Sequence, residues 1–401
     1  MSARRNPYRT APGSLPPELA GRDGELGAAD YAIAMTRAGI PAKPIVFTGL
    51  RGMGKTALLR RCAAGAWAEG ALPIVAEADK ALRFGEVMRR ELLAALSRTE
   101  PLPKRLTAAL SRIAERLPKI SYELPHDAGG ISLSAGDFDE HETAGADELE
   151  DTLLTLNEQL REHDRFLVIG IDEIQESPAA DLLRIIRVVH KTAGSEQPVL
   201  LFGAGLPNSP VVLKAARTYT ERYAYLRLEL LSRTATIEAV DAPARRLGVV
   251  WEPAAADALF ALSGGYPYFV QEYASAAWLK HRDDVITEAD INAVALGVQT
   301  MLDESIYHRQ FAQISPREAI YVLTLYRLGP GVHHSEEIAA ALGLPSSELG
   351  SARSQLLKKD VLFAPARGLT EFRLPLTDAY IDRHLDELVK RASLGENNLK
   401  R

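Results

Sequence analysis

"GLRGMGKT", residues 49–56, places three glycines and one lysine between two apolar segments. The preceding "PIVFTG" predicts a short buried strand, and the following "ALLRRCAAGAWA" predicts a helix. A strand, a glycine-rich loop and a helix in this order are the setting in which the motif G-x-x-x-x-G-K-[ST] binds phosphate groups. The stretch therefore predicts a phosphate-binding loop in an α/β fold.

The residue types in this loop indicate the role of each position. Gly49, Gly52 and Gly54 can adopt positive φ and expose backbone N–H groups to an anion. The N-terminus of the following helix adds unpaired N–H groups and partial positive charge. Lys55 is predicted to reach the β- and γ-phosphates, and the Thr56 hydroxyl to face Mg²⁺. An ordinary glycine turn before a helix is the alternative. The other loop residues predicted to line the nucleotide are Leu50, Arg51, Met53 and Ala57.

Two acids at the end of another apolar strand supply what hydrolysis needs beyond binding. The strand "FLVIGI" ends in Asp172 and Glu173, and α/β sheets place their ligand sites at the carboxyl ends of strands. Asp172 is predicted to hold Mg²⁺, directly or through water, and Glu173 to polarise the attacking water. A solvated strand end is the alternative, but the phosphate loop upstream favours the catalytic interpretation.

The nucleotide is predicted to be ATP, with ADP as the product and Mg²⁺ as the metal. The chain has no Asn-Lys-x-Asp stretch, with which a GTPase reads the guanine base. Nothing in the sequence resembles the Arg-rich acceptor site of an adenylate-kinase-like transferase beside the loop. Both alternatives are therefore weaker than an ATPase.

Length and composition limit the class of protein. A chain of 401 residues suggests two or three domains, and 46% hydrophobic with 25% charged residues is typical of globular proteins. The net charge of −6 gives no overall reason to expect nucleic-acid binding. Cys62 is the single cysteine, which excludes an internal disulfide. The start of the chain, "MSARRNPYRTAPGSLPP", has no apolar core of signal-peptide length, and no apolar run approaches the roughly eighteen residues of a membrane span, so we expect a cytoplasmic protein without a membrane partner.

The order of the predicted elements indicates the domain organisation. Apolar strands alternate with helical patterns up to about residue 230, which predicts an α/β parallel sheet with helices on both faces. The segment 118–146 has no periodicity, which predicts a loop or hairpin insertion that is mobile. Residues 232–305 show helical patterns only, and from about 315 three helices precede a two-stranded hairpin, as in a winged helix. The predicted parts are an extended arm (1–18), a P-loop ATPase core (19–230), a helical lid (231–312), a winged-helix domain (313–391) and a tail (392–401).

Five stretches in a fixed order resemble a known family. "LAGRDGEL", "FTGLRGMGKTALL", "VIGIDEIQE", "LLFGAGLP" and "SGGYPYFVQEYA" resemble the AAA-type ATPases of the archaeal-ATPase and STAND grouping, and they are similar to the origin-recognition initiator ATPases. The resemblance extends from Leu19 to about His384. It implies that Ala20, Gly21 and Arg22 lie near the adenine. It also implies that the "GGYP" turn, with Tyr266 and Pro267, closes over the nucleotide from the lid.

The chain departs from the initiator pattern in its sensor residues. "SGGYPYFVQEYA" contains no arginine to read the γ-phosphate, and Asn208 in "GAGLPN" is the only polar candidate after the fourth strand. "GGYP" is closer to the Gly-x-Pro turn of STAND switches, which remain nucleotide-bound for long periods. Arg222, with Arg217 before it, lies where related ATPases present a finger to a neighbouring subunit, and a solvated arginine is the alternative. Self-association or a protein partner therefore remains open.

The predicted winged helix has one face suited to DNA and few charges to support it. Leu349, Ala352 and Leu356 mark an inward face of the candidate recognition helix. The outward residues and their basic neighbours are Ser347, Ser351, Ser354, Lys358, Lys359 and Arg367. Their hydroxyls and charges could contact phosphates or bases, and a packing module is the alternative.

Three functions follow from these patterns. The leading interpretation is a slow, Mg²⁺-dependent ATPase that acts as a conformational switch coupled to the winged helix. The alternative is a DNA-binding regulator or initiator in which the nucleotide is chiefly structural. A third hypothesis is a partner-sensing scaffold whose winged helix only locks the nucleotide.

Overall fold

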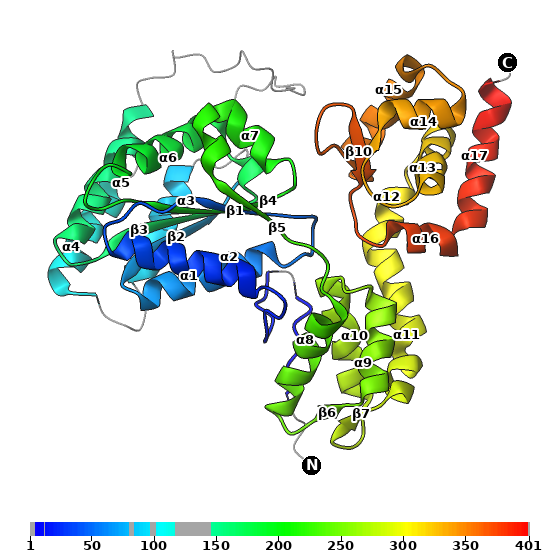
Figure 1. Ribbon diagram of the computed structural model, residues 1–401, viewed down its shortest axis with the longest axis horizontal. Helices are drawn as coiled ribbons and strands as arrows, with labels where there is room; N and C mark the ends of the chain where they lie inside the picture. The colour runs from blue at the N-terminus through cyan, green and yellow to red at the C-terminus, as the bar shows by residue number, and fades with distance from the viewer. Residues whose placement is uncertain (1–4, 12, 80–83, 97–101, 117–145, 400–401) are drawn as a thin grey trace. The chain divides into compact units, whose positions relative to one another are not determined.

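The computed structural model describes residues 5–11, 13–79, 84–96, 102–116 and 146–399, and it divides into two compact units (Figure 1). One unit contains residues 22–49 and 55–228, and the other contains residues 1–21, 50–54 and 229–401. The insertion predicted at 118–146 lies outside the described residues, apart from Ala146, which begins a helix.

The first unit contains a five-stranded parallel sheet with the strand order β2-β3-β4-β1-β5. Nearly every residue of β1 to β4 is buried, because helices cover the sheet on both faces. Figure 1 shows α1 and α2 on one face and α5 and α6 on the other. The α/β fold predicted from the sequence is confirmed. The strands are β1 (Ile45–Thr48), β2 (Ala71–Glu77), β3 (Phe166–Asp172), β4 (Leu200–Gly205) and β5 (Ala224–Arg227).

Four helices of this unit share an apolar core with the sheet. Side chains from α3, α4, α5 and α6 pack with β2 and β3 in a single buried cluster that includes Met88, Leu110, Leu153 and Ile185. The helices of the whole unit are α1 (Asp23–Arg37), α2 (Lys55–Ala68), α3 (Phe84–Leu96), α4 (Lys104–Arg116), α5 (Ala146–Arg161), α6 (Ala179–Thr192) and α7 (Ser209–Ala216), with the 3₁₀ turns η2 (Ile174–Glu176) and η3 (Thr218–Arg222).

The strand order decides what lies near the phosphate loop. β4 lies between β1 and β3, so the loop after β1 and the acids after β3 are separated by one strand. All three strands run parallel, and their carboxyl ends therefore meet at one edge of the sheet.

Four helices of the second unit lie within residues 231–312, the range predicted for the lid. They are α8 (Arg233–Arg245), α9 (Pro253–Ser263), α10 (Pro267–Lys280) and α11 (Glu288–Leu302). The expectation of helices only over 232–305 is wrong in one respect, because β6 (Val250–Trp251) and β7 (Val285–Ile286) form a short parallel pair. These residues are extended just before α9 and α11, and their backbone groups pair with each other.

The C-terminal part of this unit combines helices with a small sheet. Antiparallel β9 and β10 form a hairpin, and β8 pairs with the other edge of β10. The elements are the π-helical turn η4 (Asp303–His308), α12 (Arg309–Phe311), α13 (Pro316–Leu328), β8 (His333–His334), α14 (Ser335–Leu342), α15 (Ser346–Lys358), β9 (Leu362–Phe363), β10 (Leu369–Phe372), α16 (Thr377–Arg383) and α17 (Leu385–Leu399).

The described residues of the N-terminal arm are anchored by one aromatic side chain. Residues 5–10 form no helix or strand, but Tyr8 is buried, and its hydroxyl donates to the backbone oxygen of Val240 at 2.6 Å. The indole N–H of Trp251 donates to the same hydroxyl at 2.7 Å. The sequence predicted an extended segment but not this anchor.

None of the helices in the described part of the chain combines the length and apolar character that a membrane span requires.

Candidate functional site

The loop between β1 and α2 has the backbone conformation that a phosphate site needs at two of its three glycines. Gly52 and Gly54 have φ of +73° and +87°, in the left-handed region that favours glycine. Gly49 is a correction to the sequence prediction, because it does not have positive φ. Its N–H donates to the oxygen of Gly205 at 3.2 Å, so this N–H group extends the pairing of β1 with β4 and is not available to an anion.

The remaining loop residues differ in exposure. The Arg51 side chain is exposed, Leu50 is half-buried, and Met53 and Ala57 are buried. The two buried side chains pack within the protein, and contact between these loop residues and a nucleotide stays a prediction.

Lys55, Thr56 and Asp172 converge at the N-terminus of α2. Lys55 is the first residue of α2 and is only 5% exposed, while Asp172 ends β3 and is 7% exposed. Burial raises the pKa of Asp172, and the hydrogen bond from the Thr56 hydroxyl and the charge of Lys55 oppose this shift. A hydroxyl and a buried carboxylate are oxygen ligands of the type that Mg²⁺ takes, and a cation would offset the cost of burying the charge. The residues present therefore fit a magnesium site.

Glu173 follows Asp172 in a left-handed conformation, with φ 48° and ψ 43°. For a residue other than glycine, this conformation costs roughly 1–2 kcal/mol of free energy, and such conformations cluster at functional sites. The Glu173 N–H donates to Oδ1 of Asp172 at 3.0 Å, and the Glu173 carboxylate accepts a hydrogen bond from Nε2 of Gln175 at 2.6 Å. Gln175 was not among the predicted site residues, although this polar residue lies only two positions after Glu173 in "DEIQ".

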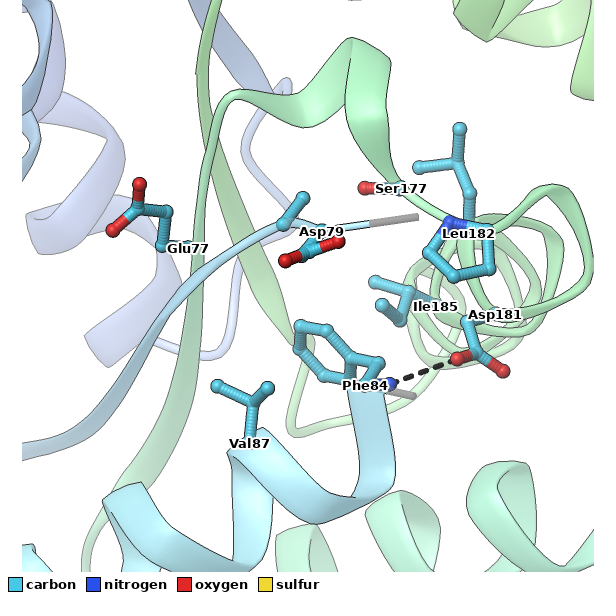
Figure 2. Close-up of a pocket in the computed structure, with 10 residues that line it drawn as sticks. Glu77, Asp79, Phe84, Val87, Ser177, Asp181, Leu182 and Ile185 are labelled. Carbon is cyan, nitrogen blue, oxygen red and sulfur yellow. Dashed lines mark hydrogen bonds between the residues drawn. The ribbon is translucent and has the colours of Figure 1, made fainter. Parts of the chain in front are cut away.

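A pocket at the carboxyl end of β2, lined by Glu77, Phe84 and Asp181 among others, is too small for a nucleotide (Figure 2). It has a volume of about 10 Å³, which is room for about one water molecule. Asp181 accepts a hydrogen bond from the Phe84 N–H at 2.8 Å and pairs with Arg184, so this buried acid caps the start of α3.

The residues expected near the adenine lie at the junction of the arm and α1. Ala20 and Arg22 are buried, and Gly21 has φ +67°. A Cβ at Gly21 would lie 2.6 Å from Cβ of Ala235, so only glycine fits there. Contact with adenine stays a prediction.

Tyr266 lies against the phosphate loop. Its hydroxyl donates to the backbone oxygen of Arg51 at 2.9 Å, and a Cβ added at Gly52 would lie 2.2 Å from that hydroxyl. Burial raises the pKa of Tyr266, so the hydroxyl is protonated at neutral pH. Pro267, half-buried, is the first residue of α10 and has the fixed φ suited to a helix start.

The expected sensor and finger residues differ in their exposure. Asn208 is half-buried before α7, and its Oδ1 is buried without a hydrogen bond among the described residues. Arg222 is exposed at the end of η3, and Arg217 precedes η3 and is half-buried. Their roles stay predictions.

The residues expected to face DNA are exposed, with the exception of Lys359. Leu349, Ala352 and Leu356 are buried as predicted. The exposed residues are Ser347, Ser351, Ser354, Lys358 and Arg367. Lys359 is a correction, because its ammonium group donates to the buried Glu318 carboxylate at 2.6 Å and to the oxygen of Gln313 at 2.8 Å. A lysine that neutralises a buried acid is not free to bind a phosphate.

Two family models match separate parts of the chain. Residues 18–202 match a model described as an AAA ATPase domain, and residues 304–381 match a domain of unknown function, DUF8462. No curated protein is similar enough to count as a match.

Solved structures match over nearly the full length. The Walker-type ATPase PABY2304 of Pyrococcus abyssi is 16% identical, with a TM-score of 0.55 over 93% of this chain and 99% of that one. Cdc6p from Pyrobaculum aerophilum is 15% identical, over 94% and 97%, with a TM-score of 0.46. The RuvB Holliday junction branch migration motor of Thermotoga maritima is 16% identical, over 94% and 99%, with a TM-score of 0.45. The first of these shows a common fold.

Proposed function

We propose, from the premise that residues 18–202 form an AAA-type P-loop ATPase domain, that this chain is a slow Mg²⁺-dependent ATPase that works as a conformational switch. One observation carries the proposal: Lys55, Thr56 and Asp172 converge at the N-terminus of α2, with Glu173 next in the chain. Separate segments of sequence supply these groups, and an ordinary glycine turn has no need of them.

Each residue has a role that its chemistry supports. The backbone N–H groups of the loop and the Lys55 ammonium bind the β- and γ-phosphates, and the Thr56 hydroxyl and Asp172 carboxylate hold Mg²⁺. Mg²⁺, when bound, neutralises negative charge on the phosphate oxygens. Glu173 orients the attacking water and accepts its proton. The Glu173 and Lys55 variants argued in the Discussion test these roles.

Contacts within the second unit support a switch that links the phosphate loop to the C-terminal helices. Tyr266 contacts the loop at Arg51, and its ring centroid lies 4.7 Å from that of Phe269. Phe269 contacts Tyr307 edge-on at 6.4 Å, and Tyr307 stacks on Tyr380 of α16 at 4.8 Å. A change in the loop therefore has a packed route to α16.

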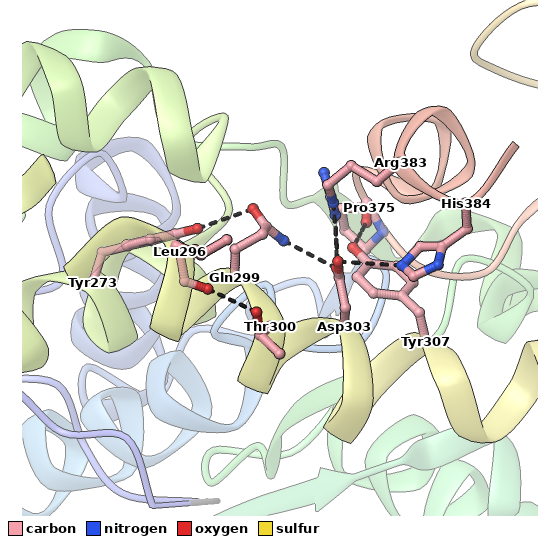
Figure 3. Close-up of polar contacts among 9 residues, drawn as sticks. All are labelled: Tyr273, Leu296, Gln299, Thr300, Asp303, Tyr307, Pro375, Arg383 and His384. Atoms are coloured by element: carbon pink, nitrogen blue, oxygen red, sulfur yellow. Dashed lines mark hydrogen bonds and ion pairs between the residues drawn. The ribbon is translucent and has the colours of Figure 1, made fainter. Parts of the chain in front are cut away.

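Asp303, in the π-helical turn η4, makes further contacts between η4 and α16 (Figure 3). Asp303 accepts hydrogen bonds from Nε of Arg383 at 2.9 Å and from Nη2 at 2.7 Å. It also accepts one from Nε2 of Gln299 at 3.0 Å, and the Tyr307 hydroxyl donates to the oxygen of Pro375 at 2.6 Å. A bidentate pair of this kind specifies one geometry, and π-helical turns are frequent at functional sites.

Tyr266→Phe is expected to accelerate nucleotide release with the fold intact. The variant loses only the hydroxyl that bonds to the loop, and one such hydrogen bond contributes about 0.5–1.5 kcal/mol, or roughly 2- to 10-fold in rate. Stopped-flow measurement of a fluorescent ADP analogue gives the off-rate. Tyr268→Phe, at the neighbouring half-buried tyrosine, is the matched control. Equal off-rates in both variants and the native chain would contradict a switch that acts through Tyr266.

A DNA-binding regulator is the second candidate, favoured by the exposed residues of α15. We propose that α13 to α15 with β8 to β10 form a winged helix, and that Ser351, Ser354 and Lys358 face DNA with Arg367 of the hairpin turn. Because Lys359 pairs with Glu318, two of the three basic residues predicted to contact DNA, Lys358 and Arg367, are exposed.

This candidate predicts weak, salt-sensitive binding that depends on those two cations. Neutralising two phosphates gives a slope of log affinity against log salt of about −1.8. Lys358→Glu with Arg367→Glu should abolish this binding and leave ATP affinity unchanged. Lys104→Glu with Arg105→Glu, two exposed residues of α4, changes net charge equally and should have little effect. Gel shifts at two salt concentrations provide the measurement, and equal losses in both double variants would indicate non-specific charge attraction only.

A further inference from the structure

The side chain of Gln175 joins the Glu173 carboxylate to the carboxyl end of β4. Its Nε2 donates to Oε2 of Glu173 at 2.6 Å. Its Oε1 accepts from the backbone N–H of Leu206 at 3.0 Å and from the Ser209 hydroxyl at 3.2 Å. Gln175 is 8% exposed, so these bonds lie in a mostly water-excluded place, where an unpaired polar group is costly.

The amide orientation follows from these partners. An ionised carboxylate only accepts hydrogen bonds, so it must face the NH₂ group, while the Leu206 N–H, which can only donate, must face the amide oxygen. A glutamate here would put a second negative charge against Glu173, and an apolar side chain would make neither contact. Glutamine satisfies both sides with one side chain.

Two features of the local sequence allow Gln175 to reach both Glu173 and the end of β4. The left-handed Glu173 starts the turn η2, in which the Glu176 N–H donates to the oxygen of Glu173 at 2.7 Å. On the β4 side, a Cβ at Gly205 would lie 2.4 Å from Oε1 of Gln175 and 2.3 Å from the Ser209 hydroxyl. The glycine that ends β4 therefore leaves the space that the Gln175 amide occupies.

We propose that Gln175 is a positioning residue that holds the Glu173 carboxylate in place relative to the end of β4. Asn208 is the one polar sensor candidate that the sequence offers after the fourth strand, and its Oδ1 has no hydrogen-bond partner among the described residues. Gln175 supplies the polar connection to that strand end from the β3 side instead. This inference rests on the proposed function, because it requires Glu173 to orient the water.

Gln175→Met is the first test, since methionine keeps the length of the side chain and removes both polar groups. ATP affinity and KM should stay within about twofold of the native values, while kcat falls by roughly 10- to 100-fold, as for other groups that orient a catalytic residue. Gln197→Met is the matched control. Gln197 is also 8% exposed and lies in the same unit, and its Nε2 donates to the oxygens of Asn157 and Arg165, at the other end of β4. A similar fall in kcat in both variants would overturn the proposal.

Two further variants separate positioning from structural support. Gln175→Glu keeps an acceptor oxygen for Leu206 and Ser209 but places its second carboxylate oxygen against the Glu173 carboxylate, which repels it. If Gln175 positions Glu173, kcat should fall at least as much as in Gln175→Met. A purely structural role predicts a milder loss. In a Glu173→Gln background, Gln175→Met should lower kcat no further, because the carboxylate it positions is gone; an additive loss would overturn the proposal. Glu173→Gln alone tests the proposed function, so the two can fail separately.

Discussion

Glu173→Gln is expected to bind ATP as tightly as the native chain and to hydrolyse it about 10²- to 10⁴-fold more slowly, which is the usual contribution of a general base. The amide keeps the size of the side chain and can still contact water, but it cannot accept a proton. Binding is spared because Lys55, Thr56 and Asp172 remain. Phosphate release under saturating ATP measures turnover, and calorimetry measures affinity.

Glu176→Gln is the control for this variant. Glu176 belongs to the same short turn, η2, and is also half-buried, so it reports what the loss of one negative charge does to local structure. Turnover in Glu176→Gln should stay close to that of the native chain. A hydrolysis rate unchanged in Glu173→Gln would assign Glu173 to an ordinary strand end. A native chain that binds ATP without hydrolysing it would favour the structural nucleotide of the DNA-binding candidate.

Lys55→Ala is expected to weaken ATP binding by roughly 10- to 100-fold or more, because hydrogen bonds to charged groups contribute about 1.5–3 kcal/mol each. Lys55 is buried at the first position of α2, where its charge adds to that of the helix N-terminus. Its charge also opposes the rise in the pKa of Asp172 that burial causes. Removing Lys55 therefore weakens the phosphate site and also makes the ionised form of Asp172 less favourable.

Lys104→Ala provides the comparison, because Lys104 is likewise the first residue of a helix, α4, but is exposed. Calorimetric titration of both variants with ATP and Mg²⁺, beside thermal unfolding to confirm the fold, gives the two affinities. Lys104→Ala should match the native chain. Equal ATP affinity in Lys55→Ala and the native chain would exclude the loop as the phosphate site.

Features that depend on neighbouring residues in the chain were predictable from the sequence. The loop of residues 49–56 and the helix that follows it were predictable from a contiguous motif, although α2 begins at Lys55, two residues before the predicted helix. Asp172 and Glu173 were selected because they end an apolar strand. In each case the local structure depends mainly on the residues themselves. Glycine permits positive φ in a loop, and a run of apolar residues forms a strand that is buried in a parallel sheet. The inward face of α15 at Leu349, Ala352 and Leu356 was predictable for the same reason.

Contacts between distant residues were decided only by the tertiary structure. Gly49 gives its N–H to Gly205 because β4 pairs with β1, and Lys359 is neutralised because α13 places the buried Glu318 beside it. The sequence alone determined which groups could bind a nucleotide, since that chemistry resides in residue types and short spacings. The tertiary structure decided which groups are already paired, that Gln175 reaches both Glu173 and the end of β4, and that Asp303 and Arg383 meet across 80 positions. Such pairings depend on how the elements pack, and a hydrogen-bonding side chain has no preference for one distant partner until packing brings that partner within about 3 Å.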